Sequence, residues 1–166
     1  MLNLMDELRY VNKEKIDKIA TLALSNKDIL EELVKISISN DEYTSQHASL
    51  IIQTIVKKDS KIISPYIDDI IDALPTFVNN SQLSNFIETL EYVDFDSPNI
   101  YEFCFNLIID QNRPGFVKIN CVKMLGIAAK KDNILKETLS TFLKEKYNSL
   151  ESSYLKKEVL IVLDNL

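Results

Sequence analysis

Residues 119–136 read INCVKMLGIAAKKDNILK, and a closely similar pattern occurs earlier, where residues 46–63 read QHASLIIQTIVKKDSKII. Both stretches contain Lys-Lys-Asp, at 57–59 and at 130–132, and aligning these tripeptides sets an offset of 73 residues. Apolar residues recur at intervals of three and four in each stretch, which is the spacing that lines one face of an α-helix. The alignment pairs Ala48 with Cys121, Ile51 with Met124, Ile52 with Leu125, Ile55 with Ala128, Ile62 with Leu135, Tyr66 with Leu139 and Ile70 with Leu143.

An offset of this size equals two steps of about 36 residues, an interval typical of helix-pair repeats. The intermediate step falls on residues 81–110, where Ile100, Cys104 and Ile108 repeat the spacing of Ile62, Tyr66 and Ile70. A single helix pair cannot bury both of its apolar faces, so such pairs pack on one another. The sequence therefore predicts an all-α fold, an α/α superhelix in which antiparallel helix pairs stack as a short solenoid.

Capping residues mark where the helices begin. Asn12, Asn26, Asn40 and the pair Ser97-Pro98 each precede a helical pattern, and Pro114 opens another. A short first segment at 2–10 is followed by nine predicted helices, which span residues 13–25, 27–38, 41–58, 61–75, 81–93, 98–110, 114–131, 133–147 and 151–166.

Two stretches of the chain resemble the repeats of a known family. FVKINCVKMLGIAAKKD (116–132) followed by NILKETLSTFLK (133–144) looks like a HEAT-type repeat, with a small residue and Leu-Gly in the first helix and leucines spaced at four in the second. KIISPYIDDIIDALP (61–75) resembles the second helix of such a repeat, including its proline. The likeness covers about residues 41–166, and we expect a single HEAT-like repeat domain over residues 1–166.

The whole chain also resembles a group of short bacterial HEAT-like proteins that are often named adenylosuccinate lyase. The lyase family has a mobile Ser-Ser-x-Met-Pro-x-Lys-x-Asn loop, whereas Ser152-Ser153 is followed here by Tyr154-Leu155-Lys156, without Met-Pro. One histidine and two glycines leave little material for that active site. The sequence therefore favours the repeat fold over the lyase activity.

Charge and composition narrow the choice of function. The net charge of −6 is uneven, because residues 1–59 carry −2, residues 60–113 carry −7 and residues 114–166 carry +3. An acidic middle repels phosphate backbones, so nucleic acid is an unfavoured partner. No apolar run approaches membrane-spanning length, and Asp6 and Glu7 interrupt the start where a secretory signal would be apolar. We expect no membrane association, a cytoplasmic protein, and two buried, unpaired cysteines, Cys104 and Cys121.

The sequence contains few residues that are typical of a catalytic or cofactor site. His47, the one histidine, flanks an apolar stripe near Asp41, Glu42 and Tyr43, and we expect a structural residue there rather than a general base. Gly115 and Gly126 are isolated, so no Gly-rich phosphate loop is present, and neither GxSxG nor HExxH occurs. We therefore expect no catalytic residue, no metal site and no cofactor.

Two polar stripes on the second helices of their repeats are the best functional lead. In HEAT-like stacks the second helices line the concave side, so we expect these stripes to form one continuous acidic surface. A solvated face is the simplest alternative, and weak binding of a divalent ion by two carboxylates one turn apart is another. The candidate binding residues are Asp68, Asp69 and Asp72 in the first stripe, and Asn99, Glu102, Asn106 and Asp110 in the second.

The resulting hypothesis is a non-enzymatic protein-interaction module whose acidic concave face binds a protein or peptide with a basic surface. The alternative is a HEAT-like DNA glycosylase, which holds duplex in a basic groove; here only Lys118, Lys123, Lys130 and Lys131 could face phosphate. An enzyme related to adenylosuccinate lyase is the third choice. The apolar run in EVLIVLDNL (158–166) indicates either a homodimer contact through this last helix or a tightly packed cap.

Overall fold

The computed structural model describes residues 3–41 and 43–166, and within these ranges the chain is all-α, as predicted. The α-helices are α1 (Leu4–Glu7), α2 (Lys13–Ser25), α3 (Lys27–Ser37), α4 (Thr44–Lys58), α5 (Ile67–Ala73), α6 (Asn80–Leu90), α7 (Pro98–Ile109), α8 (Gly115–Ala129), α9 (Asn133–Lys146) and α10 (Ser153–Asn165). Short 3-10 helices span Ser60–Tyr66, Leu74–Thr76 and Tyr147–Ser149. None of the described helices is both long enough and apolar enough to cross a membrane.

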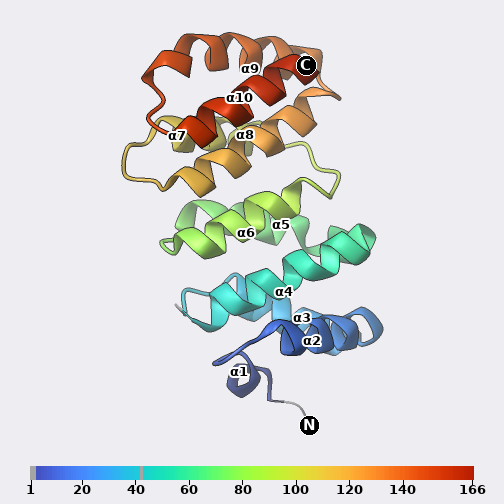
Figure 1. The fold of residues 1–166 in the computed structure, drawn as a ribbon. Helices are drawn as coiled ribbons and strands as arrows, with labels where there is room; N and C mark the ends of the chain where they lie inside the picture. The colour runs from blue at the N-terminus through green and yellow to red at the C-terminus, as the bar shows by residue number, and fades with distance from the viewer. Residues whose placement is uncertain (1–2, 42) are drawn as a thin grey trace. The chain divides into compact units, whose positions relative to one another are not determined.

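The chain divides into two compact units, Met1–Phe95 and Asp96–Leu166, and the boundary falls in the connection between α6 and α7. Figure 1 shows unit 1 from blue to green and unit 2 from yellow to red. The expectation of a single domain over residues 1–166 stays a prediction.

In unit 1, α4 is the central helix and packs against α2, α3 and α6. Its buried face carries Ala48, Ile51, Ile52 and Ile55, all of which have no exposed surface. These are the residues that the repeated apolar pattern placed in the core. Phe77 and Phe86 stack beside this core, with ring centroids 5.4 Å apart.

In unit 2, α8 packs against α7, α9 and α10. An idealised Cβ on Gly115 would lie 3.9 Å from Ser152 Oγ, and one on Gly126 would lie 2.9 Å from a Val162 methyl carbon. The first residue of α8 thus lies near the start of α10, and the last turn of α8 lies near the last turn of α10. The two helices therefore run in the same direction. This is the arrangement expected of the first helices of successive repeats.

The repeated Lys-Lys-Asp motif has the same structural role in both places. Asp59 Oδ1 accepts a hydrogen bond of 3.0 Å from the Lys61 amide and caps the first 3-10 helix. Asp132 Oδ1 accepts bonds of 2.8 and 3.1 Å from the Ile134 and Leu135 amides and caps α9. In each repeat the aspartate closes the turn and begins the second helix, which explains why it recurs at the same position.

One predicted helix is different in the structure. The continuous helix expected at 61–75 is a 3-10 helix followed by the short α5, because Pro65 has no amide hydrogen for an α-helical bond. Ile70, which the alignment placed in the core, is buried as predicted, but the two aligned positions nearer Pro65 are not. Ile63 is fully buried, whereas Ile62 and Tyr66, which the alignment placed in the core, are half-buried.

The helix predicted at 41–58 also begins later than expected, at Thr44. No capping bond from the predicted cap Asn40 is present among the residues that the structure describes. Asp41 caps the helix instead: its Oδ1 accepts bonds of 2.9 Å from the Thr44 amide and 2.6 Å from the Thr44 hydroxyl. Asparagine and aspartate are both good N-terminal caps, so adjacent candidates could not be ranked from the sequence.

Candidate functional site

The first acidic stripe lies on α5 in unit 1. Asp68, Asp69 and Asp72 are all exposed, while Ile67 and Ile70 on the opposite face are buried. No ion pair is formed by these three carboxylates within the described parts of the chain. Asp68 and Asp69 stand in the first turn of the helix, where negative charge is favoured by the helix dipole. The stripe is thus a solvent-facing patch of unpaired negative charge.

The second stripe lies on α7 in unit 2. Asn99, Glu102 and Asn106 are exposed, and Ile100, Cys104 and Ile108 on the other face are buried. Asp110 has a different role, because its carboxylate accepts a 2.9 Å bond from the Asn112 amide and lies 3.7 Å from Arg113 Nε. Its primary contribution is to the turn that ends α7.

An acidic face on α9 was missed by the sequence reasoning. The exposed residues Glu137, Thr141 and Glu145 follow one another at intervals of four, and with Thr138 and Phe142 they line an open hollow of about 470 Å³. The Phe142 ring meets Phe105 of α7 edge to face, with centroids 4.8 Å apart. This contact places Phe142 of α9 beside α7, so unit 2 carries exposed carboxylates on two helices that touch each other. The eight-residue spacing of Glu137 and Glu145, which places both on one side of a helix, was the sequence signal that could have indicated this face.

The first stripe belongs to unit 1 and the second stripe belongs to unit 2. The expectation that they join into one continuous acidic surface stays a prediction. Each unit nevertheless carries exposed carboxylates on a second helix of a repeat, α5 in unit 1 and both α7 and α9 in unit 2.

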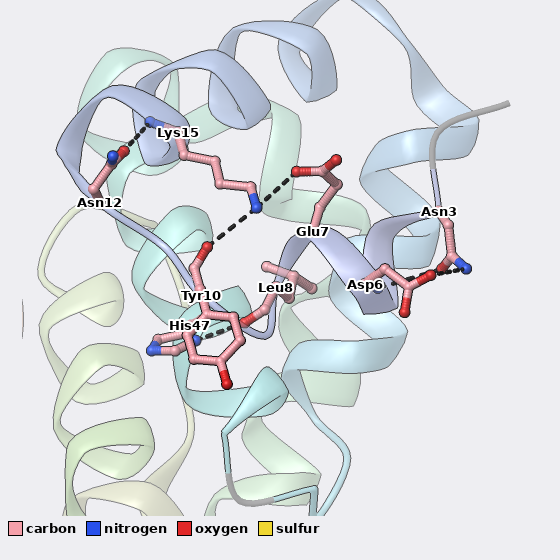
Figure 2. A network of polar contacts seen from close by, with 8 residues as sticks. All are labelled: Asn3, Asp6, Glu7, Leu8, Tyr10, Asn12, Lys15 and His47. Atoms are coloured by element: carbon pink, nitrogen blue, oxygen red, sulfur yellow. Dashed lines mark hydrogen bonds and ion pairs between the residues drawn. The ribbon is translucent and has the colours of Figure 1, made fainter.

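His47 makes a hydrogen bond that joins α4 to the first segment of the chain. Figure 2 shows its ring reaching the segment that follows α1, where Nδ1 lies 2.6 Å from the Leu8 carbonyl oxygen. A carbonyl oxygen only accepts, so Nδ1 carries the proton and donates this bond. Of the neighbours considered as partners, Asp41 caps α4 and Glu42 lies outside the described residues.

The same network fixes the start of α2. Lys15 Nζ lies 2.7 Å from Glu7 Oε2 and 3.1 Å from the Tyr10 carbonyl oxygen (Figure 2). The hydrogen bond and charge of Lys15 lower the pKa of Glu7. Asn12 caps α2 through a 2.9 Å bond from the Lys15 amide to its side-chain oxygen. These polar groups satisfy one another and serve to hold the first segment on the fold.

Cys104 and Cys121 are free and buried, which confirms the prediction. They lie on α7 and α8, and the structure brings their thiols together. Burial raises the pKa of Cys121 well above its ordinary value, and the hydrogen bond with Cys104 raises it further. A thiol held in this protonated form is a poor nucleophile, so the pair is part of the core.

Two observations bear on small ligands. Among the described residues, no group of three or more histidine, cysteine, aspartate or glutamate side chains could hold a metal ion. A cavity of about 180 Å³ in unit 2 lies beside the starts of α8 and α10. It is lined by residues of both charges, including Arg113, Lys118 and Glu151, and has no pattern that selects one ligand class.

The described helices pack in neighbouring pairs with their apolar faces turned inward, and this defines the class of the protein as an all-α helical repeat protein. The particular family follows from comparison with known families: residues 5–166 match the HEAT repeat domain, and the chain belongs to that family. No curated protein and no solved structure gives a significant match.

Membership confirms the HEAT-like α-solenoid class predicted from the sequence. HEAT repeats usually bind other proteins through extended surfaces, and the family is generally non-enzymatic. The family therefore suggests an interaction or scaffold role, without naming a partner.

Proposed function

We propose that this chain is a non-enzymatic interaction module that binds a protein or peptide with a basic surface through its acidic second helices. The observation that supports the proposal is a set of exposed carboxylates with no ion-pair partner within the described residues: Asp68, Asp69, Asp72, Glu102, Glu137 and Glu145. Residues that only solubilise a surface tend to be interspersed with lysines. The carboxylates of α5 and α7 are not, because these two helices contain no lysine or arginine, whereas α9 also carries Lys136, Lys144 and Lys146.

Electrostatics gives the expected signature of such a partner. Exposed charges attract an oppositely charged surface over about 10 Å at moderate ionic strength, and salt screens that attraction. Complementary charge acts mainly on the association rate and on specificity. We therefore expect a partner rich in lysine or arginine that is released as salt is raised. Free thiols at Cys104 and Cys121 suit the cytoplasm, where thiols stay reduced, and we propose that location.

The test is affinity purification from the native cell at low and at high salt, with mass spectrometry of the retained proteins. One variant carries Asp68→Lys and Asp72→Lys on α5, and a second carries Glu102→Lys and Glu137→Lys on unit 2. A matched control, Glu14→Lys with Glu32→Lys, makes the same change in net charge on exposed positions of α2 and α3.

The expected result is a basic protein that the wild type and the control retain at low salt, and that at least one of the acidic-surface variants loses. Comparison of the two variants shows which unit binds. Equal retention by the control and by both variants would contradict the proposal, and so would a partner that high salt does not release.

A further inference from the structure

The exposed side of α10 carries a self-complementary stripe. Tyr154, Lys157, Ile161 and Asp164 follow one another at intervals of three, four and three, which places them on one face of the helix. Tyr154 is 78% exposed, Ile161 is 44% exposed and the adjacent Leu160 is 46% exposed. The opposite face of α10 carries the buried Leu155, Val159 and Val162 and packs on α8. The stripe and the adjacent Leu160 therefore form an exposed surface of mixed apolar and charged side chains in the described chain.

The spacing of three, four and three is that of residues which form a seam between two packed helices. The charged members of the stripe are arranged symmetrically around its apolar centre, since Lys157 and Asp164 stand at equal distances from the midpoint between Leu160 and Ile161. Neither Lys157 nor Asp164 has an ion pair within the parts of the chain that the structure describes.

We infer that α10 is the contact of a symmetric homodimer, in which the stripe packs antiparallel against the same stripe of a second copy. A two-fold axis between Leu160 and Ile161 brings Lys157 of each copy opposite Asp164 of the other and sets the apolar centres together. A two-fold contact requires a surface that complements itself, and the part of the stripe from Lys157 to Asp164 meets this requirement in both charge and apolarity, whereas Tyr154 lies outside that part.

Charge supports the same occupant. Asp164 is an exposed carboxylate with no ion pair within the described residues. A lysine from an antiparallel copy would neutralise that charge. A basic partner in general would be repelled by Lys157, and an acidic partner by Asp164, so a second copy in this register fits better than either.

The face of one 13-residue helix is small beside the roughly 800 Å² that each partner buries in a standard interface. The dimer is therefore weak and dissociates on dilution. It does not depend on the function proposed above, because α10 carries none of the residues assigned to partner binding.

The test is sedimentation velocity of the full chain over about a hundredfold range of concentration. The wild type should change from monomer to dimer across the range. Lys157→Glu sets a carboxylate opposite Asp164 of the other copy and should weaken the dimer at least about tenfold. The double variant Lys157→Glu with Asp164→Lys restores opposite charges at both ends and should restore the dimer. Lys144→Glu, on an exposed position of α9, is the control with the same change in charge.

These variants change exposed side chains only, and circular dichroism verifies that each one folds. A wild type that stays monomeric throughout the range would overturn the inference. So would a dimer that Lys157→Glu leaves intact, or one that the double variant fails to restore.

Discussion

At the scale of single residues, Gly126 sets how closely α8 and α10 approach. A Cβ at this position would lie 2.9 and 3.2 Å from the two methyl carbons of Val162, which are closer than ordinary van der Waals contacts. Val162 is β-branched and confined in its rotamers, so it cannot easily turn away. The glycine is needed here for close packing, since no residue in the described chain has a positive φ.

Gly126→Ala should therefore destabilise the fold. Overpacking costs about 1–3 kcal/mol, and the higher helix propensity of alanine returns about 1 kcal/mol, so a net loss of up to about 2 kcal/mol is expected in urea unfolding. In a Val162→Ala background the same change should cost nothing, because the methyl groups it meets are gone. Gly115→Ala is the control: its Cβ would lie 3.9 Å from the nearest atom. A loss that persists in the Val162→Ala background would refute this account.

Asp41 gives a prediction about pH. Hydrogen bonds from the Thr44 hydroxyl and amide hold the pKa of its carboxyl below the ordinary value of 3.8. A pKa lowered by folding contributes stability that is present above the unfolded pKa and is lost as the pH falls through the folded one. Asp41→Ala should cost about 1 kcal/mol at neutral pH, and the difference from wild type should shrink below pH 3.8.

Asp41→Asn is the informative comparison for that cap. Asparagine keeps a neutral acceptor for the Thr44 amide, so it should retain most of the stability at neutral pH and show no loss of its own in acid. Urea unfolding at neutral pH and below pH 3.8 would measure both variants. An alanine variant whose deficit is the same at both pH values would show that the charge of the cap is irrelevant.

At the scale of elements, Gln82 joins α6 to the end of α3. Its side-chain amide donates bonds of 2.8 Å to the Ser37 carbonyl oxygen and 2.9 Å to the Ser39 carbonyl oxygen, more than 40 positions earlier in the chain. The side chain is buried, with 2% exposure. These carbonyls belong to the end of α3, where no helical partner remains for them. One buried side chain thus caps a helix and fastens two repeats together.

Gln82→Leu keeps the approximate volume of the side chain but removes the donor and leaves the Ser37 carbonyl buried without it. We expect a loss of about 1–3 kcal/mol in urea unfolding, together with faster amide hydrogen exchange near Ser39. Gln111→Leu, at an exposed position, should stay within about 0.5 kcal/mol of wild type. An unchanged exchange rate at the end of α3 would mean that these bonds do not hold that helix.

The helices also show where the sequence pattern was sufficient to predict which side chains are buried. The helix-spaced residues of α4 and α7 are buried as predicted, because one regular helix projects its side chains at a fixed angle. The prediction was wrong for Ile62 and Tyr66, which lie in the 3-10 turn around Pro65, and right for Ile70, where the chain is α-helical again. Periodicity assumes constant geometry, and a proline within the pattern is the warning that this assumption fails.

At the scale of the whole molecule, the all-α class and the HEAT family could be predicted because both depend on repetition along the chain. The candidate site could be predicted only in part. Asp68 and Glu102 are exposed on second helices as expected, but the α9 face was missed because its link to α7 is the contact between Phe105 and Phe142. A contact between distant rings leaves no periodic signal, and the dual use of Asp110 in a turn leaves none either.

The burial of both free cysteines, Cys104 and Cys121, has a practical consequence for fluorescent labelling. The chain has two cysteines, and both are buried in the folded protein, with the pKa of Cys121 raised by that burial. A maleimide dye reacts with exposed thiolates, so it should not label the native protein. It should label a single cysteine that is introduced at a solvent-exposed position of a helix. Fluorophores for tracking binding or self-association could thus be attached to α5, α7 or α10 without first replacing the native cysteines.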